Sequence, residues 1–185
     1  ATGAFGALGH GITDVDTAQL MPFSSGSILP STVKAVKKGA CGAAGELRGD
    51  FDLTGDLGEL CANTDSGVFG TLTEEDYAPA LCDAVPVGTA KAGGAVIRSN
   101  VEGDAVREYD IEILKVVPSA ADGRDMVISV TDPELIAATG GIVQGMSGSP
   151  ILQDGQIVGA VTHVLLNDPT KGYGISIENM LNAAK

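Results

Sequence analysis

Residues 150–161 read PILQDGQIVGAV. Two apolar runs flank the dipeptide Asp154-Gly155, and Asp-Gly between such runs is a strong short-range signal of a β-hairpin. The type I′ turn of a tight hairpin needs a positive φ at both central positions, which this pair of residues tolerates. We therefore predict an antiparallel hairpin at this position.

Further short segments of β type lie before this hairpin. They are residues 4–9, 33–37, 67–72, 85–87, 95–98, 109–116 and 126–130. Residues 109–116 alternate with period two, as a half-buried strand does. The 185 residues include 26 glycines and 8 prolines for turns, and aromatic residues make up only 4%, so aliphatic side chains must fill the core. This pattern predicts an all-β fold.

Two helices are also predicted. Asp132 is a good N-cap for the first helix, and Pro133 and Glu134 suit its first turn. Gly140 suits the end of this helix. A second helix is expected near the C-terminus, over residues 178–184.

The formal net charge is −13. This charge repels nucleic-acid phosphates and anionic membranes, so it argues against a nucleic-acid partner and leaves polypeptides as partners. No apolar run reaches the roughly 18 residues that span a bilayer. The chain opens ATGA without the features of a signal peptide, so we expect a processed form or an excised domain, with any export signal upstream.

The three cysteines, Cys41, Cys61 and Cys82, match no zinc-binding spacing, and the sequence predicts neither a metal nor another cofactor. A single disulfide and three buried, reduced side chains are both compatible with this spacing. Segment 50–59 holds three aspartates and one glutamate, but not in the order of an EF-hand calcium loop. We interpret this segment as a solvated acidic stretch.

The segment just before the hairpin, residues 145–148, reads GMSG. A serine hydroxyl is a weak nucleophile that needs a base and an oxyanion hole. Gly145 can adopt the unusual φ and ψ that turn its N–H beside the N–H of Ser147, and Gly148 lets a substrate carbonyl approach closely. We predict Ser147 as a nucleophile and these two amides as an oxyanion hole. Ser149 is interpreted as a turn residue, because the proline after it has no N–H and no glycine stands two residues before it.

Two histidines are candidates for the base, His10 and His163. His10 follows an apolar strand that ends in glycine, where a side chain can be presented at a cleft. His163 lies on the strand that returns after the hairpin and is expected to line a substrate groove. We therefore predict His10 as the general base.

The residues alone leave the acid of a catalytic triad open. Asp132 could orient the imidazole and stabilise its charged form, but the same residue is a convincing helix N-cap. Asp14 and Asp16 lie close to His10 in the sequence, and Asp110 lies on a predicted strand. No carboxylate is preferred on chemistry alone.

Five segments resemble a known family. They read GHGITD at 9–14, VTDPEL at 130–135, GIVQGMSGSP at 141–150, AVTHV at 160–164 and NDPTKGYG at 167–174. Through these segments the chain resembles the stage IV sporulation protein B (SpoIVB) peptidase family, from about Phe5 to Leu181. The two segments nearest the C-terminus, AVTHV and NDPTKGYG, are highly specific for this family.

The resemblance implies a serine peptidase with the double β-barrel of chymotrypsin and trypsin. We expect a single peptidase domain over residues 1–185, with sub-barrels at about 1–90 and 91–185 and a cleft between them, a C-terminal helix and one short internal helix. Carried over by motif, the family's catalytic residues fall on His10, Ser147 and Asp132. On this ground Asp132 becomes the preferred acid.

The resemblance also implies a biological role. In spore-forming bacteria such peptidases signal between two cell compartments by cleaving a membrane-bound regulator. We expect a secreted signalling protease of sporulation, an endopeptidase acting in the intermembrane space of the developing spore. Family members usually carry an anchor, a PDZ module and an extra strand before the strand of Phe5, so we expect this sequence to be a mature product or a fragment.

Substrate-binding residues are expected near the nucleophile. Thr162, His163 and Val164 are expected to form the strand that pairs with an extended substrate. Gly141 is expected at the floor of the primary pocket with no charge nearby, which favours a small or apolar residue before the cleaved bond. Met146 stands where the wider trypsin group has Asp, so activation by an ion pair to a new N-terminus is not expected.

Two other classes of function are compatible with these residues. One is a catalytically inactive β-barrel module that binds a peptide strand without cutting it. The other is a structural domain of a spore-envelope assembly. A serine-reactive probe separates both from a peptidase, because only an activated serine is labelled.

Overall fold

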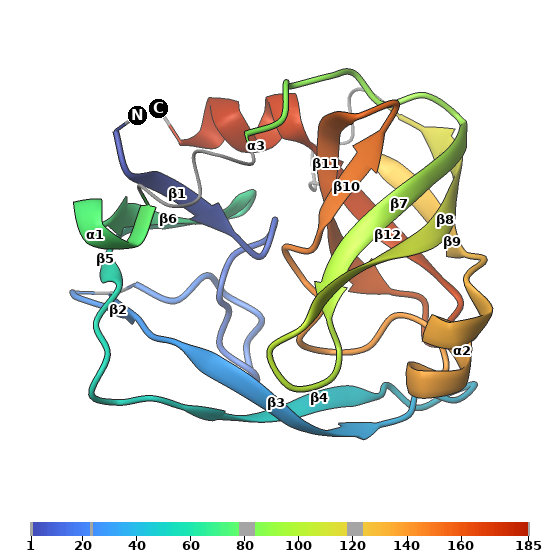
Figure 1. The fold of residues 1–185 in the computed structure, drawn as a ribbon, viewed down its shortest axis with the longest axis horizontal. Helices are drawn as coiled ribbons and strands as arrows, with labels where there is room; N and C mark the ends of the chain where they lie inside the picture. Colours follow the sequence, from blue (N-terminus) through green and yellow to red (C-terminus); the bar gives the residue numbers. More distant parts are fainter. Residues whose placement is uncertain (1, 23, 78–83, 118–123, 185) are drawn as a thin grey trace.

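Figure 1 shows the computed structural model of the chain, in which two β-rich halves pack side by side. The structure describes residues 2–22, 24–77, 84–117 and 124–184. The predicted all-β fold in two parts is confirmed: the second half closes into a barrel, and the first half is a half-barrel.

The described residues of the first half form two separate sheets. The strands are β1 (Ala4–Ala7), β2 (Ser27–Ile28), β3 (Ser31–Lys37), β4 (Glu46–Phe51), β5 (Gly58–Thr64) and β6 (Gly67–Leu72). Strands β1, β6, β5 and β2 form one sheet in that order, and β3 pairs with β4 alone. A short helix, α1 (Glu74–Tyr77), follows β6. This half therefore stays open.

The second half is a closed antiparallel barrel. Its strands are β7 (Gly93–Asn100), β8 (Val106–Val116), β9 (Met126–Val130), β10 (Pro150–Gln153), β11 (Gln156–Val164) and β12 (Lys171–Ser176). Their order is β10-β11-β12-β9-β8-β7, and β10 pairs with β7 to close the ring. The strand predicted at 85–87 was wrong, because this segment makes only an isolated bridge between Val87 and Ile157 of β11.

The predicted hairpin is the β10–β11 connection. Asp154 and Gly155 have φ of 52° and 75°, so both turn positions are left-handed, as a type I′ turn requires. Leu152 pairs with Ile157 on either side of this turn. The prediction from residues 150–161 is confirmed.

The core of the barrel is aliphatic. Ile97, Ile113, Ile128, Ile151 and Val161 are completely buried, and each comes from a different strand. Inward side chains occupy alternate positions along such strands, so neighbouring strands fill one interior. Each buried side chain of this size contributes about 1.5–3 kcal/mol, which makes the barrel the stable platform of the molecule.

Helices α2 (Pro133–Thr139) and α3 (Ile177–Ala183) confirm the two predicted helices. Asp132 caps α2, its Oδ1 accepting from Leu135 N at 2.9 Å, and Gly140 ends the helix with a φ of 79°. Ser176 caps α3, its Oγ accepting from Asn179 N at 3.3 Å.

The halves are joined at several places. Phe69 of β6 packs with Ala160 of β11 and with Met180 of α3 in a small apolar cluster. The tip of the β7–β8 hairpin reaches the first half in Figure 1, where Gly103 and Val33 exchange hydrogen bonds of 3.0 and 3.2 Å. These contacts fix the half-barrel against the closed barrel.

Some smaller expectations are also settled. Cys41 and Cys61 are exposed free thiols, so the interpretation as buried side chains is wrong for both, and Cys82 lies outside the described residues. The four acidic side chains of segment 50–59 are exposed, as predicted. Among the described residues, no helix is long and apolar enough to cross a bilayer.

Candidate active site

Ser147 lies in a tight turn between α2 and β10. On either side of it, Gly145 and Gly148 have φ of 98° and 89°, a left-handed region in which residues with a Cβ are strained. A Cβ on Gly148 would also lie 2.7 Å from the backbone nitrogen of Leu8, at the end of β1. The turn therefore needs glycine for its backbone shape and for the close approach of the first half.

His10 reaches the same turn from the first half. After β1, Leu8 and Gly9 have φ of 65° and 68°, and the chain reverses just before His10. A left-handed Leu costs about 1–2 kcal/mol, which is the kind of strain that marks functional sites. A Cβ on Gly9 would lie 2.8 Å from Cγ2 of Thr162, so this reversal packs against β11.

His10 and Ser147 line one cavity of about 400 Å³. The rest of its described lining consists of Leu8, residues 142–145 and residues 162–164. The fold thus brings the predicted nucleophile and base together with one oxyanion glycine and the predicted substrate strand. We call this the serine cavity.

The hydroxyl of Ser147 donates to the carbonyl oxygen of Thr162 at 2.9 Å. On the other side, His10 Nδ1 lies 2.9 Å from the carbonyl oxygen of Gly11. A carbonyl oxygen only accepts hydrogen bonds, so Nδ1 carries a proton in this contact, and in the neutral ring Nε2 is then the nitrogen with the lone pair. His10 is therefore held in the tautomer that can take a proton at Nε2.

Successive amides of this turn alternate in their hydrogen bonding. Met146 N donates to the Val143 carbonyl at 3.2 Å, and Gly148 N donates to a carbonyl of β11 at 2.8 Å. Within the part of the chain that the structure describes, the amides of Gly145 and Ser147 donate to no acceptor. These two amides are the predicted oxyanion donors.

His163 lies beside His10. The centroids of the His10 and His163 rings are 5.0 Å apart, with 42° between the ring planes. Because His163 is part of β11, it places one wall of the serine cavity against the imidazole of His10.

The family of the chain follows from comparison with known proteins. The family model described as SpoIVB peptidase S55 matches residues 1–181. The chain belongs to the SpoIVB peptidase family. It is therefore a peptidase, a hydrolase that acts on a protein or peptide substrate.

Two solved structures of the Rv3671c protease of M. tuberculosis are similar to this SpoIVB-family chain. The inactive form is 15% identical, with 82% of this chain and 85% of that chain covered and a TM-score of 0.45. The active form is 14% identical, with 89% and 92% covered and a TM-score of 0.42. No curated protein matches the chain.

The acid that the SpoIVB resemblance implies, Asp132, lies at the start of α2. Its Oδ1 accepts from Leu135 N at 2.9 Å, and its Oδ2 accepts from Asp110 N at 3.3 Å. No Asp or Glu is present among the described residues that line the serine cavity. The structure brings His10 and Ser147 together, whereas it uses both oxygens of Asp132 to hold α2 and β8.

The carboxylates close to His10 in sequence, Asp14 and Asp16, belong to the exposed loop that follows it. Asp14 Oδ1 accepts from the backbone nitrogen and from the hydroxyl of Thr17, both at 2.9 Å. These bonds, the backbone one first, lower the pKa of Asp14. Asp14 organises its own loop and does not line the serine cavity.

Asn63 of β5 holds this loop in place, and the sequence did not single it out. Its Oδ1 accepts from Ile12 N at 2.8 Å, and its Nδ2 donates to the carbonyls of Ile12 and Met21 at 2.9 Å. The side chain thereby fastens both ends of the loop after His10. No local pattern marks Asn63, because these partners lie 51 and 42 residues away in the sequence.

The predicted substrate residues lie on two walls. Residues 162–164 end β11 and line the serine cavity. Gly141 does not line it, because it is buried with a φ of 127° against the carbonyl of Pro169. Its neighbours Ile142 and Val143 form that wall, and both are apolar.

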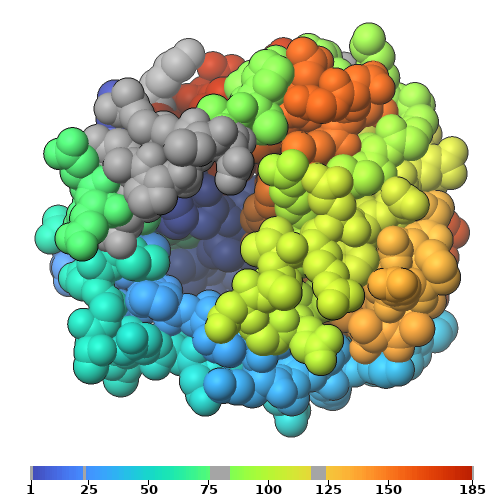
Figure 2. Space-filling view, in the orientation of Figure 1, coloured from blue at the N-terminus to red at the C-terminus, as the bar shows by residue number. Residues whose placement is uncertain are grey.

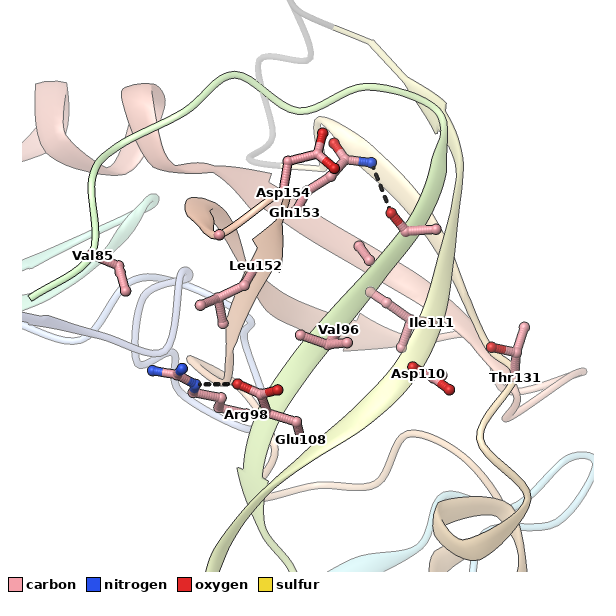
Figure 3. Close-up of a pocket in the computed structure, with 13 residues that line it drawn as sticks. Val85, Val96, Arg98, Glu108, Asp110, Ile111, Thr131, Leu152, Gln153 and Asp154 are labelled. Atoms are coloured by element: carbon pink, nitrogen blue, oxygen red, sulfur yellow. Dashed lines mark hydrogen bonds and ion pairs between the residues drawn. The ribbon is translucent and has the colours of Figure 1, made fainter. Parts of the chain in front are cut away.

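A larger cavity of about 560 Å³ lies on the outer wall of the barrel, between β7, β8 and the β10–β11 turn (Figure 3). None of the predicted catalytic residues lines it. Figure 3 shows its Arg98 and Glu108 joined to each other, Nε to Oε1 at 2.9 Å, and Gln153 bonded to the β7 backbone. The chemistry therefore favours the smaller serine cavity as the active site.

Proposed function

We propose that this chain is a serine endopeptidase in which Ser147 is the nucleophile and His10 is the general base. One observation carries the proposal. A single cavity of about 400 Å³ holds the hydroxyl, the imidazole and the turn whose Gly145 and Ser147 amides donate to no described acceptor. These are the parts that acyl transfer needs.

In the proposed acylation, the Ser147 hydroxyl leaves the Thr162 carbonyl by rotation about χ1 and donates to His10 Nε2. Oγ attacks the peptide carbonyl while Nε2 takes its proton. The amides of Gly145 and Ser147 hold the oxyanion, each such donor being worth about 10²–10³ in rate. The C–N bond then breaks, and His10 gives its proton to the leaving amine.

The acyl group leaves by the reverse sequence. Water loses a proton to His10, attacks the ester carbon and expels Oγ, which regains the proton. The Gly11 carbonyl keeps the imidazole in the right tautomer, the orienting role that a carboxylate has in a triad. A neutral carbonyl adds no negative charge beside the imidazolium, so this dyad is expected to be slower than a full triad.

The proposed substrate is a membrane-bound regulatory protein of sporulation. Membership of the SpoIVB family supports this role. The apolar wall of Ile142 and Val143 supports a small or apolar residue before the cleaved bond. The proposed place of action is the extracytoplasmic, intermembrane space of the spore, where a chain of charge −13 would meet its substrate in the aqueous phase and not by binding anionic lipid.

A fluorophosphonate probe with a fluorescent tag tests the catalytic part of this proposal. We expect labelling of the wild type, none of Ser147→Ala, and wild-type labelling of the matched variant Ser149→Ala. His10→Ala should slow labelling by about 10²-fold or more.

An inactive peptide-binding module is the second candidate, and the bond from the Ser147 hydroxyl to the Thr162 carbonyl favours it, since a hydroxyl held there does not touch the base. A wild type that resists the probe while still binding peptide would support this module and contradict the peptidase mechanism.

A further inference from the structure

A third cavity, of about 740 Å³, lies between the two halves of the chain. Residues of β3, β4 and the β7–β8 hairpin line it, together with Leu8, Gly145 and the start of β10. Figure 2 shows a hollow on this face, between the β7–β8 hairpin and the first half of the chain. We name this cavity the Arg98 groove.

The Arg98 groove is continuous with the serine cavity. Leu8 and Gly145 line both of them. Gly145 carries one of the proposed oxyanion amides, and Leu8 packs on the turn that holds Ser147. A polypeptide whose carbonyl sits at Ser147 can therefore extend from one cavity into the other.

The direction of such a polypeptide follows from the parts of each cavity. Residues 162–164 line the serine cavity with Ser147, so the acyl side of the substrate is assigned to β11 as part of the proposed mechanism. The leaving amine departs on the opposite side of the carbonyl. The Arg98 groove meets the serine cavity at Leu8 and Gly145 and contains neither Ser147 nor residues 162–164, so the leaving side is assigned to it.

The walls of the groove are apolar and held in place. Phe51 of β4 and Val106 of β8 line it and are exposed by 67% and 66%. Large apolar side chains gathered at a concave surface are typical of binding sites. The hydrogen bonds between Val33 and Gly103 join the two walls, so the groove is formed before any ligand binds.

The groove has an unusual charge for this chain. Arg98 lines this groove as well as the outer-wall cavity, and it is the one charged residue among the described residues that line the groove, in a protein of net charge −13. Its Nε donates to Glu108 Oε1 at 2.9 Å, and no described residue accepts from its two terminal nitrogens. The Arg98 side chain is 38% exposed, and a guanidinium with unused donors recognises carboxylates well.

We propose that the Arg98 groove binds the substrate segment on the C-terminal side of the cleaved bond and selects apolar and acidic side chains there. This inference rests on the proposed serine mechanism. It specifies which substrate side chains the site prefers after the cleaved bond. Phe51 and Val106 provide the apolar contacts, and Arg98 provides the charged contact.

Acyl transfer to added peptides tests the inference. The enzyme is acetylated with p-nitrophenyl acetate, and the amides Leu-Glu-Glu and Leu-Gln-Gln compete with water for the acetyl group. The peptide α-amine attacks the ester carbon, the bond to Ser147 Oγ breaks, and His10 returns the proton to Oγ. The yield of N-acetyl peptide, measured by mass spectrometry with Ser147→Ala as background, reports on binding in the groove.

Leu-Glu-Glu amide should give about threefold more N-acetyl peptide than Leu-Gln-Gln amide, because an exposed charge pair usually contributes this much. Arg98→Gln should bring this ratio close to one. Arg107→Gln removes the same charge outside the groove and should keep the ratio.

Phe51→Ala should lower the yield with Leu-Glu-Glu relative to Gly-Glu-Glu by about fivefold. Leu53→Ala, which removes a side chain that is 81% exposed outside the groove, should not. Because Phe51 is itself largely exposed, its truncation leaves the fold intact.

The experiment distinguishes failure of the proposed serine mechanism from failure of the inference about the Arg98 groove. If the wild type releases no more p-nitrophenol than Ser147→Ala, the proposed function fails and the inference fails with it. If Ser147 is acetylated but both peptides give equal yields, or Arg98→Gln keeps the ratio, the inference alone is overturned.

Discussion

The two halves of the chain differ in construction. The second half is a closed barrel with a continuous aliphatic core, whereas the first half is an open sheet with a separate two-stranded ribbon. Among the described residues, the buried hydrophobic side chains of the first half are Val68 and Phe69, and the others lie beyond residue 89. The buried apolar side chains that stabilise the fold are thus concentrated in the second half.

The candidate site takes one catalytic group from each half. Ser147 sits on the turn that enters the barrel, and His10 sits on a loop of the open half. The packed core of the barrel places Ser147, whereas a strained reversal of the chain and the hydrogen bonds of Asn63 place His10. Changes in the first half should therefore affect rate more than stability, and changes in the barrel should do the opposite.

The largest effect is expected for His10→Ala. It should lower the rate of peptide cleavage by about 10³-fold, because the proton of Ser147 loses its acceptor. The midpoint of thermal unfolding should change little, since this ring belongs to the weakly packed half. Cleavage assays and thermal unfolding of the same preparation check both statements. Retention of wild-type activity would remove His10 from the mechanism.

A matched pair of truncations compares the two cores. Val158→Ala in the barrel should reduce the free energy of unfolding by about 2 kcal/mol. Val68→Ala in the first half should cost about half of that by the same rule, because Val68 already lines a cavity of about 190 Å³. Chemical denaturation measures both values. Equal losses would mean that the open half contributes as much as the barrel.

The loop of the base is tested at Asn63. Asn63→Ala removes three hydrogen bonds from this loop and should lower kcat by about tenfold through misplacement of His10. Asn63→Asp keeps the acceptor for Ile12 N and should lie between the alanine variant and the wild type. A change in KM without a change in kcat would contradict this positioning role.

A substitution at Asp132 tests whether this residue serves as a helix cap or as a catalytic acid. Asp132→Ala should cost about 1 kcal/mol of stability, as the loss of an N-cap does. The activity of the folded fraction should stay near that of the wild type, because both carboxylate oxygens serve α2 and β8. A loss of activity of 100-fold or more in a fully folded variant would restore the role that the family resemblance implies.

The smallest expected effect is on the pH dependence of stability. The hydrogen bond from Lys171 lowers the pKa of Asp168, in the loop before β12. The carboxylate therefore stabilises the fold above its unfolded pKa of about 3.9, and this contribution is lost as pH falls through the lower folded value. Asp168→Asn should flatten the acid side of a stability–pH curve slightly, and less so at high salt. A steeper curve in the variant would contradict the sign.

Local signals predicted much of the barrel. The Asp154-Gly155 turn, the cap at Asp132 and the glycines around Ser147 each specify a backbone shape within a few residues, so the sequence alone identifies them. The role of Asp132 was less certain, because one carboxylate can cap a helix or orient a histidine. Its position 15 residues before Ser147 is compatible with both roles, and only the fold shows that its two oxygens accept from Leu135 N and Asp110 N.

Local sequence patterns could not predict the features that depend on residues far away in the chain. The separation of the β3–β4 ribbon from the main sheet of the first half is a matter of long-range strand pairing. The left-handed Leu8 could not be predicted, because a residue with a Cβ adopts this φ only when its surroundings impose it. Asn63 has no motif around it. The sequence therefore singled out His10, which lines the serine cavity, but it did not indicate which residues hold the His10 loop in place.

The packing of Leu8 on Gly148 makes the enzyme sensitive to its own assembly. The backbone of Leu8 touches the turn of the nucleophile, and the base lies two residues further along the same chain. Any movement that draws the halves apart would therefore separate His10 from Ser147 and uncover the serine turn in one step. Under the proposed mechanism, the rate of peptide cleavage would then depend directly on the contact between the two halves.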